Sequence, residues 1–92
     1  MTDPKLLLTA VQEVLFSEWD PIGVNHYESC HDEYDSYAPT ICRWLLEGVD
    51  EVKLAAHLDE IQRVSMGLSS VDGGANRRIA RRLLALPGTA PR

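Results

Sequence analysis

Apolar side chains recur at helical spacing in four stretches of this chain, and this periodicity restricts its possible folds more than any other feature. The stretches are residues 3–19, 34–47, 51–66 and about 74–86. No segment shows the sustained alternation of apolar and polar residues that is typical of a half-buried strand. The pattern therefore predicts an all-α fold, a compact bundle of about four helices with short links.

The residues between these stretches are those that end or cap helices. Pro21 stops the first helix, because proline disfavours a helical conformation at the residue before it. Gly48 and Gly67 each precede an apolar residue, an arrangement typical of a left-handed C-cap with its hydrophobic contact. Asp50 is the expected N-cap of the third helix.

The length sets the size of the fold. A chain of 92 residues forms one small domain with a modest core. We expect this domain to cover residues 1–86 and residues 87–92 to form a disordered tail, since Pro87 and Gly88 stop the last helix. We expect the third helix to bury Leu54, Leu58 and Ile61, supported by Val52.

Charge is distributed unevenly along the chain. The formal net charge is -5, from 14 acidic and 9 basic side chains. An acidic surface disfavours nucleic-acid binding and suits a basic partner. The last helix carries four arginines on one face: Arg77, Arg78, Arg81 and Arg82. We expect them to pair with the acids, within the molecule or across a dimer, and DNA binding through this face is the alternative.

One acidic segment is the strongest candidate for a binding surface. Between Glu18 and Asp35 the chain has six acids and no lysine or arginine. Tyrosine is enriched at the centres of protein interfaces, and carboxylates steer basic partners. The predicted partner-binding residues are Asp20, Glu28, Asp32, Glu33, Tyr34 and Asp35. The alternative is a solvated loop without a partner, with Tyr37 in the core.

The same segment holds residue types that bind metals. His26, Cys30 and His31, with Asp32 and Glu33 beside them, suit zinc or another transition metal, but their spacing matches no recognised signature. We therefore predict no metal and no cofactor. A stand-alone regulatory helical domain that binds a metal or small ligand near His26, Cys30 and His31 is the alternative function.

Catalytic motifs are missing from the sequence. The carboxylates near Asp32 could act with His26 or His31 in acid–base chemistry, but no nucleophile lies in a recognisable context. Gly73-Gly74 could favour a phosphate before a helix, but two glycines without a longer pattern are better explained as part of a capping loop. We therefore expect a protein that is not an enzyme.

Two cysteines are too few for a disulfide framework. The sequence shows no secretory signal and no apolar run long enough to span a bilayer. We expect a cytoplasmic protein with reduced thiols, and a disulfide between Cys30 and Cys42 is the alternative.

Two motifs support a family resemblance. They read WDPIG at residues 19–23 and DEYDSYAPTI at residues 32–41, and Met-Gly-Leu follows at residues 66–68. Together they resemble the bacterial domain of unknown function 1871 family, over about residues 5–86. The resemblance implies a compact helical domain of unassigned biochemistry and brings no catalytic residues. The Cys30-His31 pair and the arginine-rich last helix depart from the typical member.

Short sequences of this kind are also similar to immunity proteins of bacterial toxin systems, including contact-dependent growth inhibition. This looser resemblance implies a non-enzymatic protein that neutralises a cognate toxin. We expect that toxin to be basic, because many toxin domains are basic nucleases and a carboxylate-rich face can occupy a phosphate-binding cleft. A monomer and an oligomer are both compatible with the sequence.

Overall fold

The structure is a computed structural model that describes residues 4–21, 23 and 33–89. Within these ranges the chain forms four helices and no strand, which confirms the predicted all-α bundle. The helices are α1 (Pro4–Val14), α2 (Ala38–Leu46), α3 (Glu51–Glu60) and α4 (Gly73–Leu84). Three single turns extend them: η1 (Leu15–Trp19) continues α1, η3 (Asp35–Tyr37) leads into α2, and η4 (Ile61–Ser65) continues α3.

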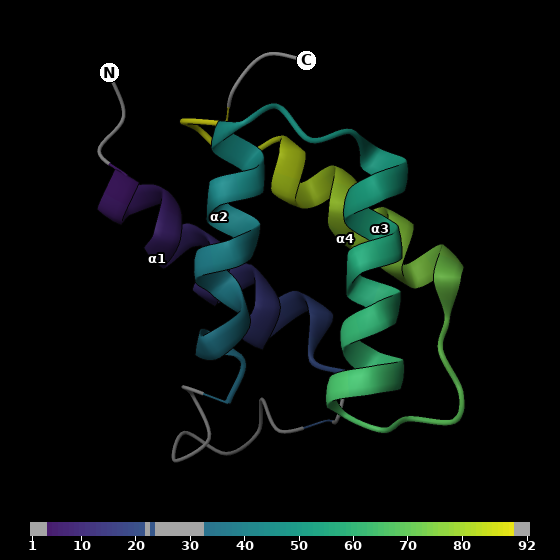
Figure 1. Ribbon diagram of the computed structural model, residues 1–92. Helices are drawn as coiled ribbons and strands as arrows, with labels where there is room; N and C mark the ends of the chain where they lie inside the picture. The colour runs from purple at the N-terminus through teal and green to yellow at the C-terminus, as the bar shows by residue number, and fades with distance from the viewer. Residues whose placement is uncertain (1–3, 22, 24–32, 90–92) are drawn as a thin grey trace.

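The helices pack around one core. In Figure 1, α2 and α3 run beside each other at the front, and α1 and α4 cross behind them. α3 packs mainly on α4 and α1 mainly on α2, while η1 also reaches α4. Each helix contributes fully buried side chains: Leu7 and Val11, Ile41 and Leu45, Leu54 and Leu58, Ala80 and Leu83. Burying a leucine stabilises the fold by about 1.5–3 kcal/mol.

The helix ends follow the sequence closely. Gly48 has a φ of 85°, its N–H donates to the Leu45 carbonyl at 3.4 Å, and the Val49 N–H donates to the Trp44 carbonyl at 3.0 Å. These bonds form a Schellman motif, which satisfies the last carbonyls of α2. The Asp50 side chain accepts a hydrogen bond from the Lys53 N–H at 2.7 Å. The predicted C-cap and N-cap are therefore confirmed.

Two expectations need correction. Val52, expected to support the core, is 65% exposed. Gly73 and Gly74 belong to α4 rather than to a loop, because Asp72 caps this helix by accepting the Ala75 N–H at 3.0 Å. After α4, the Thr89 N–H donates to the Leu86 carbonyl at 3.3 Å, and the predicted boundary of the domain at residue 86 stays a prediction.

The π-helical turns η1 and η4 are not predicted by the sequence. The Asp20 N–H donates to the Leu15 carbonyl and the Met66 N–H to the Ile61 carbonyl, each at 2.9 Å and across five residues. An extra residue within a turn changes the direction in which the following side chains point. Both turns bury large side chains, Trp19 in η1 and Gln62 in η4.

Trp44 forms the contact between α2 and α3. Its ring centroid lies 4.5 Å from that of His57, and the Lys53 Nζ lies 5.0 Å from its ring centroid. Burial lowers the pKa of His57, although the nearby Glu60 carboxylate opposes this shift. Burial of His57 at the α2–α3 junction therefore favours the neutral form of its ring.

No helix among residues 4–21 and 33–89 is both long and apolar enough to cross a membrane.

Candidate functional site

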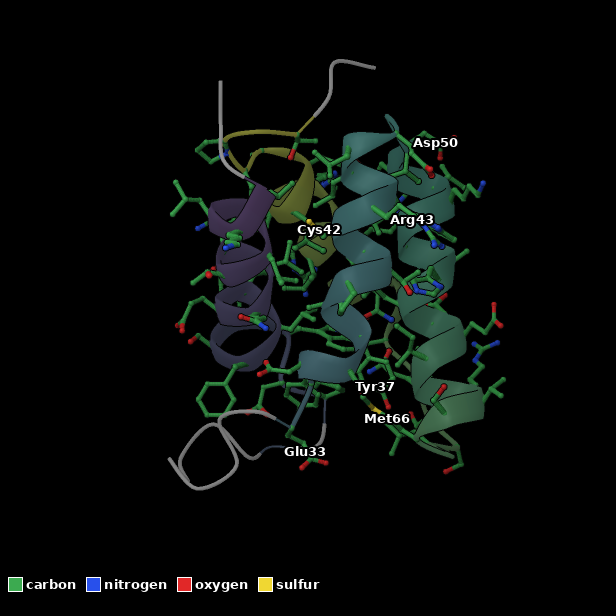
Figure 2. All side chains as sticks on the ribbon, turned by 60° about the vertical axis from the view of Figure 1, so that its left-hand side comes forward. Glu33, Tyr37, Cys42, Arg43, Asp50 and Met66 are labelled. Carbon is green, nitrogen blue, oxygen red and sulfur yellow. The ribbon has the colours of Figure 1, made fainter. Side chains whose placement is uncertain are left out.

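Two acids that precede α2 lie at one end of the bundle. Glu33 is exposed and Asp35 is half-buried in η3. Figure 2 shows Glu33 pointing away from the helices, at the opposite end of the molecule from Asp50. Neither Glu33 nor Asp35 forms an ion pair with any residue that the structure describes. We call Glu33 and Asp35 the acidic end.

Tyr34, between these two acids, is a core residue. Its side chain is 1% exposed, and its ring centroid lies 5.7 Å from that of Trp19. Its hydroxyl donates a hydrogen bond to Asp20 Oδ1 at 2.7 Å. The structure therefore places the ring of Tyr34 inside the bundle, and the contact of Tyr34 with a partner stays a prediction.

Asp20 is the acceptor of the Tyr34 hydrogen bond. It is the C-cap of η1 and has a left-handed backbone, with φ 37° and ψ 59°. Non-glycine residues adopt this conformation at a cost, and aspartate is among those that tolerate it best. Its bond to Tyr34 joins the WDPIG and DEYDSYAPTI motifs, so it fastens the end of α1 to the start of α2. Asp20 is partly buried and carries a structural role as well as a charge.

The remaining predicted residues lie outside the described part of the chain. They are Glu28 and Asp32 of the binding surface, and His26, Cys30 and His31 of the alternative ligand site. Among the residues that are described, no group of three or more His, Cys, Asp or Glu side chains could hold a metal ion. Cys42 is buried as a free thiol in α2, and this burial raises its pKa and suppresses its reactive thiolate.

A buried polar network connects η1, α3, η4 and α4. Asn76 is 1% exposed, and its Oδ1 accepts a hydrogen bond from Trp19 Nε1 at 2.8 Å. Its Nδ2 donates to Gln62 Oε1 at 2.6 Å and also to Asp59 Oδ1. Sequence reasoning missed this network, because the partners of Asn76 are distant in sequence and lie on three other elements. The single signal was an asparagine among the apolar positions of the last helix.

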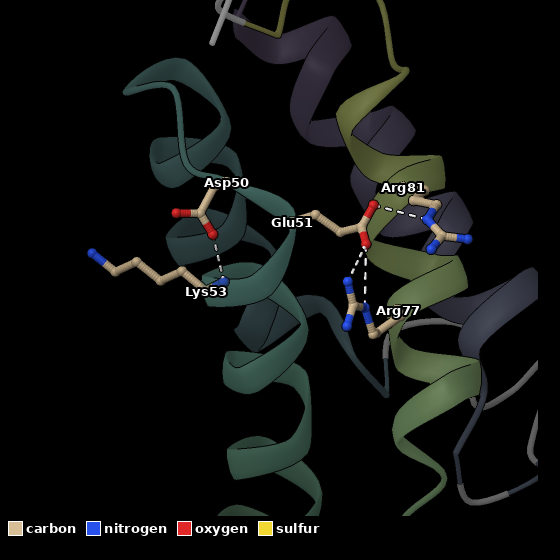
Figure 3. Close-up of polar contacts among 5 residues, drawn as sticks. All are labelled: Asp50, Glu51, Lys53, Arg77 and Arg81. Atoms are coloured by element: carbon tan, nitrogen blue, oxygen red, sulfur yellow. Dashed lines mark hydrogen bonds and ion pairs between the residues drawn. The ribbon is translucent and has the colours of Figure 1, made fainter.

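The arginine face of α4 largely pairs within the molecule. Glu51 accepts from Arg77 Nη2 at 2.9 Å and from Arg81 Nε at 2.8 Å (Figure 3). These two arginines hold the pKa of Glu51 below its ordinary value. Arg82 Nε lies 3.2 Å from Glu18 Oε1. The expectation that the arginines meet acids is confirmed for these three, whereas Arg78 has no ion pair with a described residue.

Exposed ion pairs of this kind add little stability. They do change the charge pattern of the surface, because three of the arginines of α4 are paired with carboxylates. The carboxylates of the acidic end form no ion pair with a described residue. An excess of negative charge therefore remains at the acidic end.

Comparison with known proteins gives no further assignment. We find no family model, no curated protein and no solved structure that matches this chain. The resemblance carried by the two motifs therefore stays a prediction.

Proposed function

We propose that this chain is a non-enzymatic protein-binding domain that uses its acidic end to engage a basic partner. The observation that carries the proposal is the contrast in pairing: Glu33 and Asp35 have no ion pair among the described residues, whereas Arg77, Arg81 and Arg82 do. Carboxylates without an internal partner raise the rate of encounter with a basic surface and select against an acidic one.

The fold supports this role because the backbone of the acidic end is anchored to the core of the bundle. Tyr34 lies between the two acids in sequence and is anchored by its hydrogen bond to Asp20 and its contact with Trp19. The backbone beside Glu33 and Asp35 is therefore held in place by the core. A fixed set of charges loses little conformational freedom when a partner binds.

The class of partner rests on the resemblance to immunity proteins. We propose a bacterial toxin domain with a basic active surface, neutralised in the cytoplasm by contact with the acidic end. Glu28 and Asp32, which precede Glu33 in the same acidic segment, are included in the proposed binding set.

The test uses the protein encoded directly upstream of this chain as the probe. Binding is measured by calorimetry for the wild-type protein and for Glu33→Gln/Asp35→Asn. We expect the double variant to bind about tenfold more weakly at low salt, and the difference to shrink as salt is added. The matched control is Glu47→Gln/Glu60→Gln, which removes the same charge from exposed carboxylates elsewhere on α2 and α3.

Equal losses in the two double variants would mean that net charge, rather than the acidic end, determines binding. No binding by the wild-type protein would exclude the upstream product as the partner and remove the immunity proposal.

A further inference from the structure

A cleft of about 380 Å³ lies between η1, η4 and the first turns of α4. This volume is in the range of small-ligand pockets. Both π-helical turns contribute to it, and such turns are frequent at functional sites. The polar and charged side chains that line the cleft are Glu18, Gln62, Ser70, Asp72, Asn76 and Arg78.

The amide of Gln62 offers a hydrogen-bond donor to this cleft. The indole of Trp19 can only donate, so Asn76 must present its oxygen to Trp19 and its nitrogen to Gln62. Gln62 therefore uses its Oε1 to accept from Asn76, and its Nε2 remains without an acceptor among the described residues.

The burial of Gln62 indicates where its Nε2 lies. Gln62 is only 8% exposed. No deeply buried side-chain nitrogen or oxygen in the described part of the chain lacks a hydrogen-bond partner. The Gln62 Nε2 must therefore reach the surface, and Gln62 is one of the residues that line the cleft.

Arg78 provides the charge that complements this donor. It is the arginine of the α4 face without an ion pair to any described residue. Its Nη1 lies 3.9 Å from the place that a Cβ on Gly74 would occupy, and Asp72 Oδ1 lies 3.4 Å from the same place, so the guanidinium and this carboxylate both lie near the first turn of α4. The positive end of the helix dipole adds to the same field.

The carboxylates of the cleft are already engaged. Glu18 pairs with Arg82 at 3.2 Å, and Asp72 accepts the Ala75 N–H at 3.0 Å. The donors of Gln62 and Arg78 have no such partner within the described part of the chain. The unmatched chemistry of the cleft is therefore that of a site for negatively charged oxygens.

We propose that this cleft binds the oxyanion of a small ligand, a carboxylate or a phosphate group, through Arg78 and Gln62. An arginine fork and a neutral amide donor are the groups that recognise planar or tetrahedral oxyanions in proteins. The site is separate from the proposed contact of Glu33 and Asp35, and its test does not depend on a protein partner.

The experiment titrates the ¹⁵N-labelled full chain and follows the Gln62 side-chain amide and the backbone amides of Gly73 and Gly74. Sodium phosphate is the probe in one titration and sodium acetate in the other, with sodium chloride at matched ionic strength as the blank. We expect saturable shifts with at least one probe. Saturation by phosphate assigns a phosphate-bearing ligand, and saturation by acetate assigns a carboxylate.

Two variants test the residues. Arg78→Gln should lower the affinity for the probe that saturates by about tenfold, the effect of losing one charge-assisted contact. Arg63→Gln, which removes an exposed arginine of η4, should leave binding unchanged. Gln62→Glu keeps the acceptor for Asn76 and replaces the donor with a carboxylate, so it should abolish saturation. The proposal is overturned if neither probe saturates. It is also overturned if Arg78→Gln binds the probe as tightly as the wild-type protein and Arg63→Gln do.

Discussion

At the residue scale, Asn76 determines how the two π-helical turns meet α4. Its amide is the one group in the network that both accepts from Trp19 and donates to Gln62 and Asp59. A neutral asparagine is suited to this place because it presents an acceptor on one side and two donors on the other. Replacing Asn76 with an apolar residue leaves the Trp19 donor on η1 and the Gln62 acceptor on η4 without partners.

We therefore expect Asn76→Ala to lower the free energy of unfolding by about 3 kcal/mol, since it leaves the Trp19 donor and the Gln62 acceptor unsatisfied in the interior. Urea unfolding followed by tryptophan fluorescence measures this loss. Ser65→Ala, at an exposed position of η4, is the control and should change stability by less than about 0.5 kcal/mol. A loss below about 1 kcal/mol for Asn76→Ala would show that the network contributes little.

The hydroxyl of Tyr34 gives a second prediction at this scale. Its bond to the Asp20 carboxylate joins two segments that are far apart in sequence. Tyr34→Phe removes that bond and keeps the ring, so we expect a loss of about 1–2 kcal/mol. Tyr37→Phe is the matched control, because the half-buried Tyr37 hydroxyl forms no hydrogen bond with a described residue. Equal stability of the two variants in urea unfolding would contradict a structural role for the Asp20–Tyr34 bond.

At the element scale, the sequence predicted what depends on neighbouring residues. Gly48 and Asp50 act within one turn of their own positions, so the end of α2 and the start of α3 could be assigned from local pattern. Asn76 and Trp19 depend on partners more than fifty residues apart, and no local pattern records such a distance. The π-helical turns escaped prediction for the same reason, since what stabilises them is packing between elements.

The pairing of α3 with α4 through Glu51 makes stability depend on pH. Arg77 and Arg81 lower the pKa of Glu51 in the folded state below its ordinary value of 4.5. The unfolded chain therefore binds the proton more tightly, so this contribution to stability is present above pH 4.5 and is lost as pH falls through the lowered pKa.

Glu51→Gln should accordingly be less stable than wild type at neutral pH, and the difference should vanish in acid. Urea unfolding of both proteins between about pH 3 and about pH 6 measures this change. Glu47→Gln, which removes an exposed carboxylate that forms no ion pair with a described residue, should show no such convergence. A pH-independent difference for Glu51→Gln would mean that the two arginines do not act through charge.

At the scale of the whole molecule, the charge pattern was only partly readable from the sequence. The sequence predicted that the arginines of the last helix pair with acids, and Glu51 and Glu18 supply these pairs. The sequence could not show which acids lack an internal partner. Asp20, for example, accepts a hydrogen bond from the Tyr34 hydroxyl, and this bond joins two motifs that are separated along the chain. The proposed binding surface therefore uses Glu33 and Asp35 among the described residues.

These left-over acids lead to the last prediction. Two carboxylates that are close in sequence and form no ion pair with a described residue repel each other slightly, so they do not stabilise the fold. We expect Glu33→Gln/Asp35→Asn to leave the free energy of unfolding within about 0.5 kcal/mol of wild type, or to raise it by a similar amount. Thermal and urea unfolding measure this directly. A loss above about 1 kcal/mol would assign both residues to the architecture, in the way that Tyr34 is assigned, and would remove the reason for expecting a partner there.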